Sequence, residues 1–500
     1  MWPVDPDSGS RIPIPQHVID RIVSAIVRFQ IVCVEIGVPA QNIRIIATEA
    51  TRTAINASAF MDAIRHKTGI SVEALRKEEE GVIGAWGIAS SVSDVEGLAL
   101  DLGGGSMQMT WITSHAGNVH MSSQGSVSFP YGAAALSQKL ADLERGKGKE
   151  EAHKAREQFR REMAGNFRAA FDTLNVPEQL TKGQSYPISI INGYTAPKKD
   201  FEDTEALKEV ARTAHEIFRV SDRRRKQVPS VAFLVKTLAE SLPHGINEAH
   251  FCQGGVREGV LFREMLPVVR QQDPLEVATA RYAPPSAEAL AALLLAALPR
   301  PSASRSFPSS ISLHLVQAFA NALYYHATMS KELSSSAALY STSTGILAST
   351  HGIPHDHRAL LALMLQERYG GELPPRDVEF KTHLQGILTP EEVWWTRYLG
   401  KLGFVLGQLY PTGSIDTSKP RIIPSAQWKN GLGKKGKKEG LDLTISIQKV
   451  AYDPSHLRQE LENDVQKIQK VGKRKNWIGG RNGWGIKVRV SVIEEDLVAR

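Results

Sequence analysis

The chain has 500 residues, of which 42% are hydrophobic and 23% are charged, and its formal net charge is +7. This length and composition are typical of a soluble globular protein with about two to four domains. The two cysteines, Cys33 and Cys252, exclude a disulfide framework and a zinc site built from cysteines alone. The longest apolar run, Ala289 to Leu298, has half the length that a membrane span needs, and no signal peptide is evident. We therefore expect a cytoplasmic protein without a membrane partner.

Basic residues gather in three clusters, over 223–226 in the middle of the chain and over 434–438 and 473–475 near its end. Such clusters contact nucleic acid or an acidic partner in some proteins, but most are solvated loops. Because no recognised nucleic-acid-reading module accompanies them, we expect no nucleic-acid partner.

Helical and strand patterns alternate over the first quarter of the chain. Val18, Ile22, Ile26 and Phe29 recur at helical spacing. The predicted elements are a helix over 16–37, a strand over 43–47, a helix over 54–67, a strand over 72–75 and a helix over 78–90. Such alternation predicts an α/β domain over residues 1–125.

Residues 97–112 form the most informative stretch, because two alternating strands flank a run of three glycines. A dinucleotide-binding fingerprint or a P-loop would instead pass from the glycines into a helix, so both are disfavoured. Glycines leave backbone N–H groups bare enough to approach a phosphate closely. Asp101 ends the first strand as a carboxylate able to hold a metal ion or an attacking water, and Ser106 adds a hydroxyl. An ordinary hairpin turn is the alternative, and phosphate binding is favoured over it.

The rest of the chain divides by composition into three further regions. A charged helical stretch, a strand near 188, helices over 203–219 and 229–241, and a second glycine turn over 253–259 predict an α/β unit over 126–268. Helical periodicity beyond a Pro- and Ser-rich linker predicts a helical domain over 269–410. Strands over 441–450 and 485–492 that flank a helix over 456–471 predict a small α/β tail over 411–500.

Three histidines and an aspartate between residues 351 and 357 suggest a transition-metal site. Gly352 and Pro354 interrupt any helix that would align the histidines, so a polar loop is favoured, with Asp356 as the cap of a helix that starts near Arg358.

Four motifs, in matching order and spacing, resemble the exopolyphosphatase and guanosine-pentaphosphate phosphatase family. Residues 47–56 read Ala-Thr-Glu-Ala-Thr-Arg-Thr-Ala-Ile-Asn, which is similar to the family signature Ala-Thr-x-Ala-x-Arg-x-Ala-x-Asn. The pair Glu79-Glu80 resembles the paired glutamates of the family, and Asp101 to Ser106 resembles its second phosphate loop. Residues 255–259 resemble its Gly-Leu-Arg-Glu-Gly turn, and the phrasing around 190–194 and 251–255 is most similar to a fungal retrograde-regulation branch of the family.

The resemblance implies a fold of two actin-like, ribonuclease H-like α/β lobes around a phosphate-binding cleft. It also implies a set of site residues. Glu79, Glu80 and Asp101 would be catalytic, with Asp101 holding Mg²⁺, and the phosphate ligands would be Arg52, Gly103, Gly104, Gly105, Ser106, Gly254 and Gly255.

Simpler structural roles stand beside these assignments. The acidic run over 78–80 is also what a solvated first turn of a helix would carry, since acidic side chains favour the helix N-terminus. Arg52 contacts phosphate or pairs with Glu49, two interpretations of equal weight. For Arg257 and Glu258 an ion pair that holds the second glycine turn is favoured over a role in binding.

Two departures from the family pattern bear on function. The family begins with a strand pair whose Asp-x-Gly-Ser-Asn loop forms the first phosphate clamp, and we expect that first hairpin to be missing here. The retrograde branch also carries a Gly-Gly-Gly segment where this chain has residues 177–187. The resemblance therefore implies a signalling regulator that binds a phosphorylated ligand and protein partners. An active Mg²⁺-dependent phosphohydrolase acting on polyphosphate or a guanosine polyphosphate is the first alternative, and a ligand-independent interaction scaffold is the second.

Overall fold

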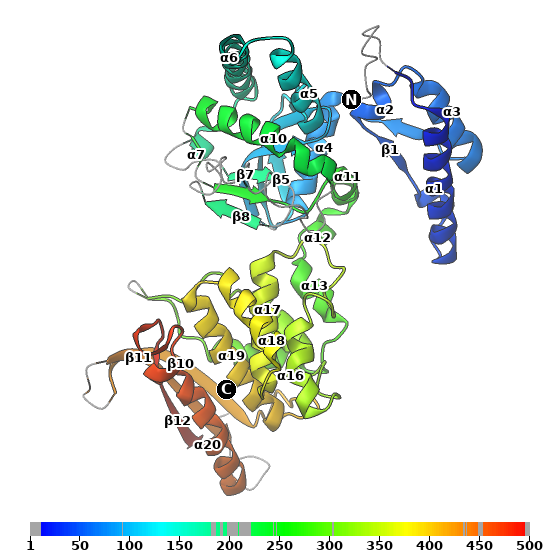
Figure 1. The fold of residues 1–500 in the computed structure, drawn as a ribbon. Helices are drawn as coiled ribbons and strands as arrows, with labels where there is room; N and C mark the ends of the chain where they lie inside the picture. Colours follow the sequence, from blue (N-terminus) through cyan, green and yellow to red (C-terminus); the bar gives the residue numbers. More distant parts are fainter. Residues whose placement is uncertain are drawn as a thin grey trace. The chain divides into compact units, whose positions relative to one another are not determined.

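The computed structural model divides into two compact units, Met1–Gln271 and Gln272–Arg500 (Figure 1). The predicted helix over 203–219, apart from residue 209, and part of the segment over 177–187 lie outside the described residues. The structure describes residues 12–92, 94–181, 187–190, 194–197, 209, 222–243, 245–246, 248–302, 305–433, 436, 438–448 and 454–495.

The first unit opens with a small layered substructure. Its two short strands pair in parallel, with Ile45 opposite Val72, and two helices supply its core, in which Ile19 and Phe60 are buried. The elements are α1 (Gln16–Glu35), η1 (Ala40–Asn42), β1 (Ile45–Ala47), α2 (Glu49–Arg52), α3 (Ala57–Thr68) and β2 (Val72–Ala74).

A larger sheet follows, with the strand order β5-β4-β3-β7-β9-β8 and β6 paired to β4. Its central strands β3, β7 and β9 run parallel, and β3 and β4 form the predicted hairpin around the glycines. The elements are α4 (Lys77–Ala89), β3 (Asp94–Leu102), β4 (Met107–His115), β5 (Asn118–Met121), β6 (Val127–Phe129), α5 (Ala133–Glu144), α6 (Lys149–Thr173), α7 (Glu178–Thr181), β7 (Pro187–Ile190), β8 (Tyr194–Pro197), α10 (Asp222–Ser241), β9 (Glu248–Phe251), α11 (Val256–Glu264) and α12 (Pro267–Arg270).

Helices cover both faces of this sheet, and β3 shows why. Successive side chains of a strand point to opposite faces. Leu98 and Leu100 accordingly belong to a core shared with α5, α6 and α10, whereas Val95 and Ala99 belong to a core shared with α4. A strand that is buried on both faces reads as a nearly continuous apolar run, which is the pattern that the sequence shows here.

The predicted boundary between two lobes at residue 125 is corrected by this topology. Strands β3 and β4 precede that boundary and β7 and β9 follow it, yet all four belong to one sheet. The sheet of β1 and β2 is separate from it. The division between the two sheets therefore falls between β2 and β3, because strands join by hydrogen bonding rather than by their spacing along the chain.

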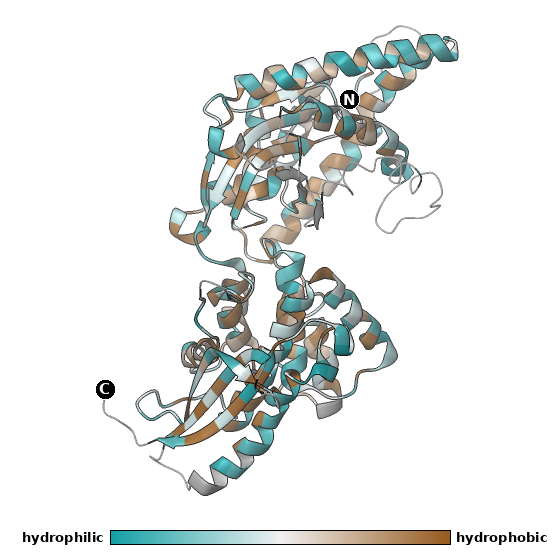
Figure 2. Ribbon diagram, turned by 90° about the vertical axis from the view of Figure 1, so that its left-hand side faces the viewer, coloured by the Kyte–Doolittle hydropathy of each residue, from teal (hydrophilic) through white to brown (hydrophobic). Residues whose placement is uncertain are grey.

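The second unit joins helices and a three-stranded sheet around one core. Buried side chains of α15, α17 and α19 share that core with β11 and α20, and Figure 2 shows brown apolar stretches on these helices and strands. The predicted helical domain and the predicted tail therefore form a single compact unit. The elements are α13 (Pro274–Ala280), α14 (Ala287–Ala296), α15 (Leu313–Ala322), α16 (Lys331–Tyr340), α17 (His355–Tyr369), α18 (Pro375–Ile387), α19 (Pro390–Leu409), β10 (Ile422–Leu432), β11 (Lys438–Gln448), α20 (Pro454–Val471), η2 (Arg474–Asn476), η3 (Gly480–Asn482) and β12 (Lys487–Glu495).

The structure also bears on the predicted helix cap at Asp356 and on the search for a membrane-spanning helix. Helix α17 begins at His355 with Pro354 as its N-cap, so Asp356 lies inside the first turn and is not the predicted cap. Among the described residues, no helix combines the length and apolar character needed to cross a membrane.

Candidate functional site

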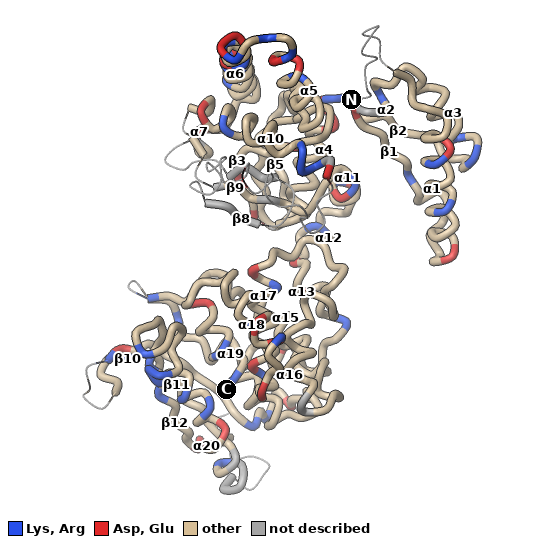
Figure 3. Tube along the Cα trace, in the orientation of Figure 1, with Lys and Arg blue, Asp and Glu red and all other residues tan. Residues whose placement is uncertain are grey.

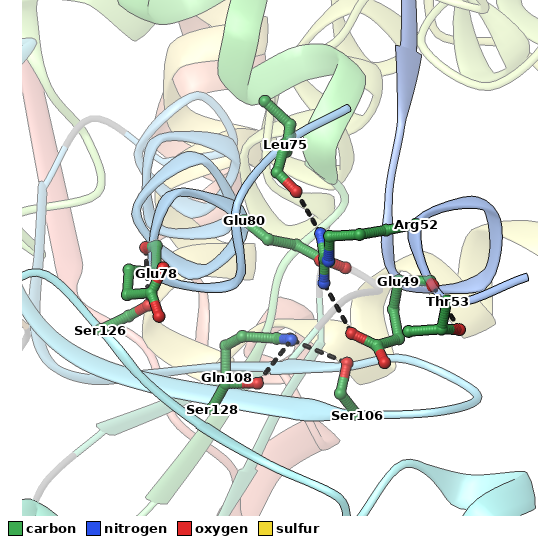
Figure 4. Close-up of polar contacts among 10 residues, drawn as sticks. All are labelled: Glu49, Arg52, Thr53, Leu75, Glu78, Glu80, Ser106, Gln108, Ser126 and Ser128. Atoms are coloured by element: carbon green, nitrogen blue, oxygen red, sulfur yellow. Dashed lines mark hydrogen bonds and ion pairs between the residues drawn. The ribbon is translucent and has the colours of Figure 1, made fainter. Parts of the chain in front are cut away.

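An arginine and two glutamates form the charged centre of the candidate site in the first unit. Arg52 ends α2, and its Nη2 atom lies 2.6 Å from Oε2 of Glu49 and 3.2 Å from Oε2 of Glu80. A third contact goes from Nη1 to the carbonyl oxygen of Leu75, at the end of β2. Figure 4 shows Arg52 between the two carboxylates, which come from α2 and α4. Pairing with Glu49, one of the two interpretations of Arg52, is therefore confirmed, with Glu80 as a second partner.

Burial raises the pKa of two carboxyl groups of the site, Glu80 and Asp101. Burial raises the pKa of Glu80, the Arg52 guanidinium opposes that rise, and the nearby Asp101 carboxylate adds to it. Burial alone raises the pKa of Asp101. A Cβ at Gly84 of α4 would lie 3.0 Å from Oδ2 of Asp101, so helix α4, which carries Glu80, lies against strand β3 at Asp101. A carboxylate with a raised pKa is also a better proton acceptor when it is ionised.

Glu79 takes a different position from its neighbour. It is only half-buried, whereas the side chain of Glu80 is 10% exposed and contacts Arg52. Successive helical residues point about 100° apart, so one member of the pair faces the sheet and the other does not. Of the predicted catalytic pair, the structure brings Glu80 to the charged centre.

The glycine turn keeps one side open. Gly103 donates from its N–H to the carbonyl oxygen of Ser106 at 3.0 Å, which closes the hairpin. Gly103 and Gly104 are exposed, and a Cβ added to Gly104 would meet nothing within 4 Å. Within the described part of the chain, the amides of Gly104 and Gly105 donate no hydrogen bond. Among the described residues these two N–H groups have no acceptor, and Gly132 packs against the Gly105 amide, because a Cβ added to Gly132 would lie 2.5 Å from that nitrogen.

The other side of the turn is held by a helix. The N–H of Ala133 donates to the carbonyl oxygen of Gly103, and those of Ala134 and Ala135 donate to the carbonyl oxygen of Gly104. The first N–H groups of a helix have no partner inside it, so the turn satisfies donors of α5 that would otherwise be unpaired. These hydrogen bonds fix the turn through the carbonyl oxygens of Gly103 and Gly104 and do not involve the N–H groups of the turn.

Ser106 is buried and faces the protein. Its hydroxyl accepts a hydrogen bond from Nε2 of Gln108 at 2.8 Å, and the same nitrogen donates to Ser128 at 3.3 Å. Figure 4 shows this serine–glutamine pair beside the arginine–glutamate cluster. In this contact the hydroxyl of Ser106 acts as the acceptor.

The second glycine turn is already occupied by internal contacts. The amide of Gly254 donates to Oγ of Ser91 at 2.6 Å, and that of Gly255 donates to Oε2 of Glu258 at 2.9 Å. A Cβ at Gly254 would lie 1.8 Å from the carbonyl oxygen of Gly87. The prediction that Gly254 and Gly255 bind phosphate through their amides is therefore corrected: this turn packs against α4 and caps α11. Arg257 and Glu258 approach to 3.7 Å, in keeping with the structural role favoured for them.

The residues described here include no group of three or more His, Cys, Asp or Glu side chains arranged to hold a metal ion. Magnesium usually keeps several waters and takes one or two carboxylates together with substrate phosphates. The pair of Glu80 and Asp101 fits that mode, in which the ligand brings part of the coordination shell.

Sequence reasoning missed three residues that shape this site. Gly84 faces Asp101, and a Cβ there would lie 3.0 Å from Oδ2 of Asp101. Gln108 orients Ser106, and the hydroxyl of Ser126 donates to the carbonyl oxygen of Glu78 at 2.8 Å. For Gly84 the sequence did carry a signal: glycine recurs at 81, 84 and 87 in a predicted helix, which is unfavourable unless close packing requires it.

A mixed α/β sheet, an aspartate before a glycine hairpin and a buried glutamate on the preceding helix lie together in the first unit. The chain belongs to the Ppx/GppA phosphatase family, whose model matches residues 6–267.

A second family model, described as the RTG2 C-terminal domain, matches residues 273–496. Retrograde regulation protein 2 of Saccharomyces cerevisiae is 34% identical over 450 residues, which cover 82% of this chain and 74% of that protein. The predicted resemblance to the family and to its retrograde-regulation branch is thereby confirmed.

Similar solved structures include two from Aquifex aeolicus and Cytophaga hutchinsonii. The Ppx/GppA phosphatase of Aquifex aeolicus is 20% identical, with a TM-score of 0.36 over 51% of this chain and 85% of that one. An exopolyphosphatase from Cytophaga hutchinsonii is 20% identical, with a TM-score of 0.37 over 50% of this chain and 82% of that one. The α/β class of the first unit is observed directly, and the two-lobed actin-like arrangement stays a prediction.

Proposed function

We propose that the protein is a signalling regulator of the Ppx/GppA family that binds a phosphorylated ligand at the glycine turn after β3. The observation that carries this proposal is the pair of amides at Gly104 and Gly105, which have no acceptor in the described part of the chain. Unpaired N–H groups on a fixed turn form an anion-binding concavity. The similarity to Retrograde regulation protein 2 supports a regulatory role, and an exopolyphosphatase among the similar structures supports a phosphorylated ligand.

Gly104→Ala tests this binding in the full chain. The added methyl group meets no protein atom, so the fold is retained, yet it stands where a ligand must approach the amides. We expect about tenfold weaker binding of ATP or tripolyphosphate at this site, measured by isothermal titration calorimetry.

Gly148→Ala is the matched control, because its added methyl group also meets nothing within 4 Å and lies at the start of α6. Its binding isotherm should equal that of the wild type. Identical isotherms for all three proteins would rule out the glycine turn as the ligand site.

Catalysis is the second candidate function, favoured by the environment of Glu80. Its pKa is raised by burial and by Asp101, which suits a general base that activates water. We expect Mg²⁺-dependent phosphate release from tripolyphosphate to be abolished by Glu80→Gln and retained by Glu79→Gln. Release that is equally sensitive to both changes, or equal to a blank without protein, would remove this candidate.

A further inference from the structure

A second concave site lies in the second unit, far along the chain from the glycine turn. It has a volume of about 520 Å³, which falls within the range of about 300–1,000 Å³ typical of ligand pockets. Helices α17, α19 and α20 and the short helices η2 and η3 form its walls. Its lining residues are Glu367, Arg397, Lys401, Lys467, Lys470, Val471, Lys475, Asn476, Trp477 and Gly480.

The lining carries an excess of positive charge. Five of these side chains are cationic and one is anionic. The single carboxylate, Glu367, is already neutralised by Lys381 at 2.8 Å and Lys401 at 2.9 Å. Burial would raise the pKa of Glu367, but these two lysines lower it to about 2, so it stays ionised and paired.

Three of the remaining cations have no anionic partner. Lys467 pairs with Asp464 at 3.1 Å, whereas Arg397, Lys470 and Lys475 form no ion pair within the described ranges of the chain. Figure 3 shows blue segments around β11, β12 and α20. Lys467 and Lys470 belong to α20, and Lys475 belongs to η2. Cationic side chains held together without counter-charges repel one another, and a bound anion relieves that repulsion.

Two buried donors in the same lining lack an acceptor. Nε of Arg397 and Nε1 of Trp477 are inaccessible to solvent and have no hydrogen-bond partner in the described structure. Buried N–H groups without a partner are uncommon and point to a missing ligand or water. Arg397 is held at the pocket wall, since its Nη1 donates to the carbonyl oxygen of Asn476 at 3.2 Å.

Neighbouring charges extend the same positive field. The pKa of Lys487 on β12 is lowered by burial and then by Lys438, Lys473 and Arg474. Lys438 and Arg474 each lie 5.9 Å from the ring centre of Trp477. The indole therefore stands at the junction of the pocket and a surrounding ring of cations.

We propose that this C-terminal cationic pocket binds a small oligophosphate anion, such as tripolyphosphate or the phosphate chain of a nucleotide. Several adjacent phosphates match several adjacent cations, and the arginine guanidinium supplies directed hydrogen bonds to phosphate oxygens. A pocket of about 520 Å³ matches a compact anion, whereas a nucleic acid requires an extended basic track. The site is separate from the glycine turn of the first unit.

The test removes two unpaired cations from the rim. Lys470→Gln combined with Lys475→Gln changes two exposed side chains, so the fold is retained. Binding is measured by isothermal titration calorimetry in full-length Gly104→Ala protein, whose glycine turn is expected to bind about tenfold more weakly, and the isotherm is compared with that of Gly104→Ala without the lysine changes. We expect at least about tenfold weaker binding of tripolyphosphate. Inorganic tripolyphosphate and ATP, titrated separately, show whether the phosphate chain alone suffices.

Lys147→Gln combined with Lys149→Gln is the matched control, since it removes the same charge from exposed positions in the first unit. It should leave the affinity unchanged. Equal losses in both pairs would overturn the proposal, because they would reflect net charge only. Equally tight binding of citrate, or tighter binding of a single-stranded DNA oligonucleotide at the same lysines, would also overturn it. Weaker binding at the first site in Gly104→Ala, with the affinity of the second site unchanged, separates this proposal from the proposed function.

Discussion

Arg52 and Asp101 show how single side chains set the charge of the candidate site. Arg52 compensates Glu80, so the pKa of that glutamate rises less than its burial alone would cause. Asp101 has no comparable cation, and burial raises its pKa without opposition. The site therefore combines one compensated and one uncompensated carboxylate, and an incoming phosphate would add negative charge to both. A cation that accompanies the ligand is consistent with this balance.

The uncompensated carboxylate has a measurable pH signature. A folded-state pKa above the ordinary value means that the native protein binds more protons than the unfolded chain between the two values. The contribution of Asp101 to stability therefore falls as pH rises through that window, which begins at its ordinary pKa of 3.8. We expect Asp101→Asn to raise the unfolding midpoint relative to the wild type at about pH 7, and to raise it less at about pH 4. Thermal unfolding across this pH range measures the difference.

Asp416→Asn is the opposite-sign control. Hydrogen bonds from Ser418 lower the pKa of Asp416, so its stabilisation is present above its ordinary pKa of 3.8 and is lost as pH falls below that value. That variant should lose stability at neutral pH and recover it in acid. A parallel trend in both variants would contradict the assignment of a raised pKa to Asp101.

Helix α4 shows what an element contributes beyond its own residues. Three glycines recur on it at every third position, and each faces a different neighbour. Gly81 faces Ser126, Gly84 faces Asp101, and Gly87 faces the backbone of Gly255. The helix therefore approaches the Asp-bearing strand and the second glycine turn closely, and that approach brings Glu80 near Asp101. The glycines lower the helix propensity of α4, but they allow backbone contact between α4 and α11.

A glycine-to-alanine change is expected to have opposite effects at the crossing of α4 and α11 and at an open position on α6. A Cβ at Gly259 would lie 2.1 Å from the carbonyl oxygen of Ile83, and backbone must shift to admit it. We expect Gly259→Ala to cost about 1–3 kcal/mol in the free energy of unfolding. Gly165 lies on the exposed side of α6, where an added Cβ would meet nothing within 4 Å. Gly165→Ala should therefore increase the free energy of unfolding by about 0.5–1 kcal/mol. Urea unfolding measures both, and destabilisation by Gly165→Ala would contradict this account.

At the scale of the molecule, no hydrophobic cluster of the described residues spans the two units. The largest cluster runs from Leu275 to Val488, and the others lie within residues 14–260. Each unit therefore has its own core and its own candidate ligand site. The scaffold alternative, in which the second unit acts without any ligand, is tested directly by the cationic pocket.

Separate cores predict separate unfolding transitions. Glu367→Gln leaves Lys381 and Lys401 without their shared partner, and we expect it to lower the stability of the second unit by roughly 2–4 kcal/mol. The folded-state pKa of Glu367 is about 2, below its ordinary 4.5, so this stabilisation is present above that ordinary value and is lost as pH falls toward about 2. Urea unfolding near neutral pH should show one transition moved by Glu367→Gln and another moved by Gly259→Ala. A single transition shifted by both would contradict independent cores.

Local patterns in the sequence determined the elements and the class of the first unit. Apolar alternation predicted the hairpin around Gly103 to Gly105, and helical spacing predicted helices close to α1, α3 and α4, because side-chain periodicity depends on local backbone geometry. The motifs around Arg52, Glu80 and Asp101 also determined the family.

Tertiary structure alone decided which of those residues act together. It placed β3 and β9 in one sheet, which moved the division between the sheets away from residue 125. It assigned the amides of Gly254 and Gly255 to Ser91 and Glu258, and it gathered the C-terminal cations of three helices around one pocket. Partners far apart in sequence meet only through packing, so their hydrogen bonds and charges cannot be read from local periodicity.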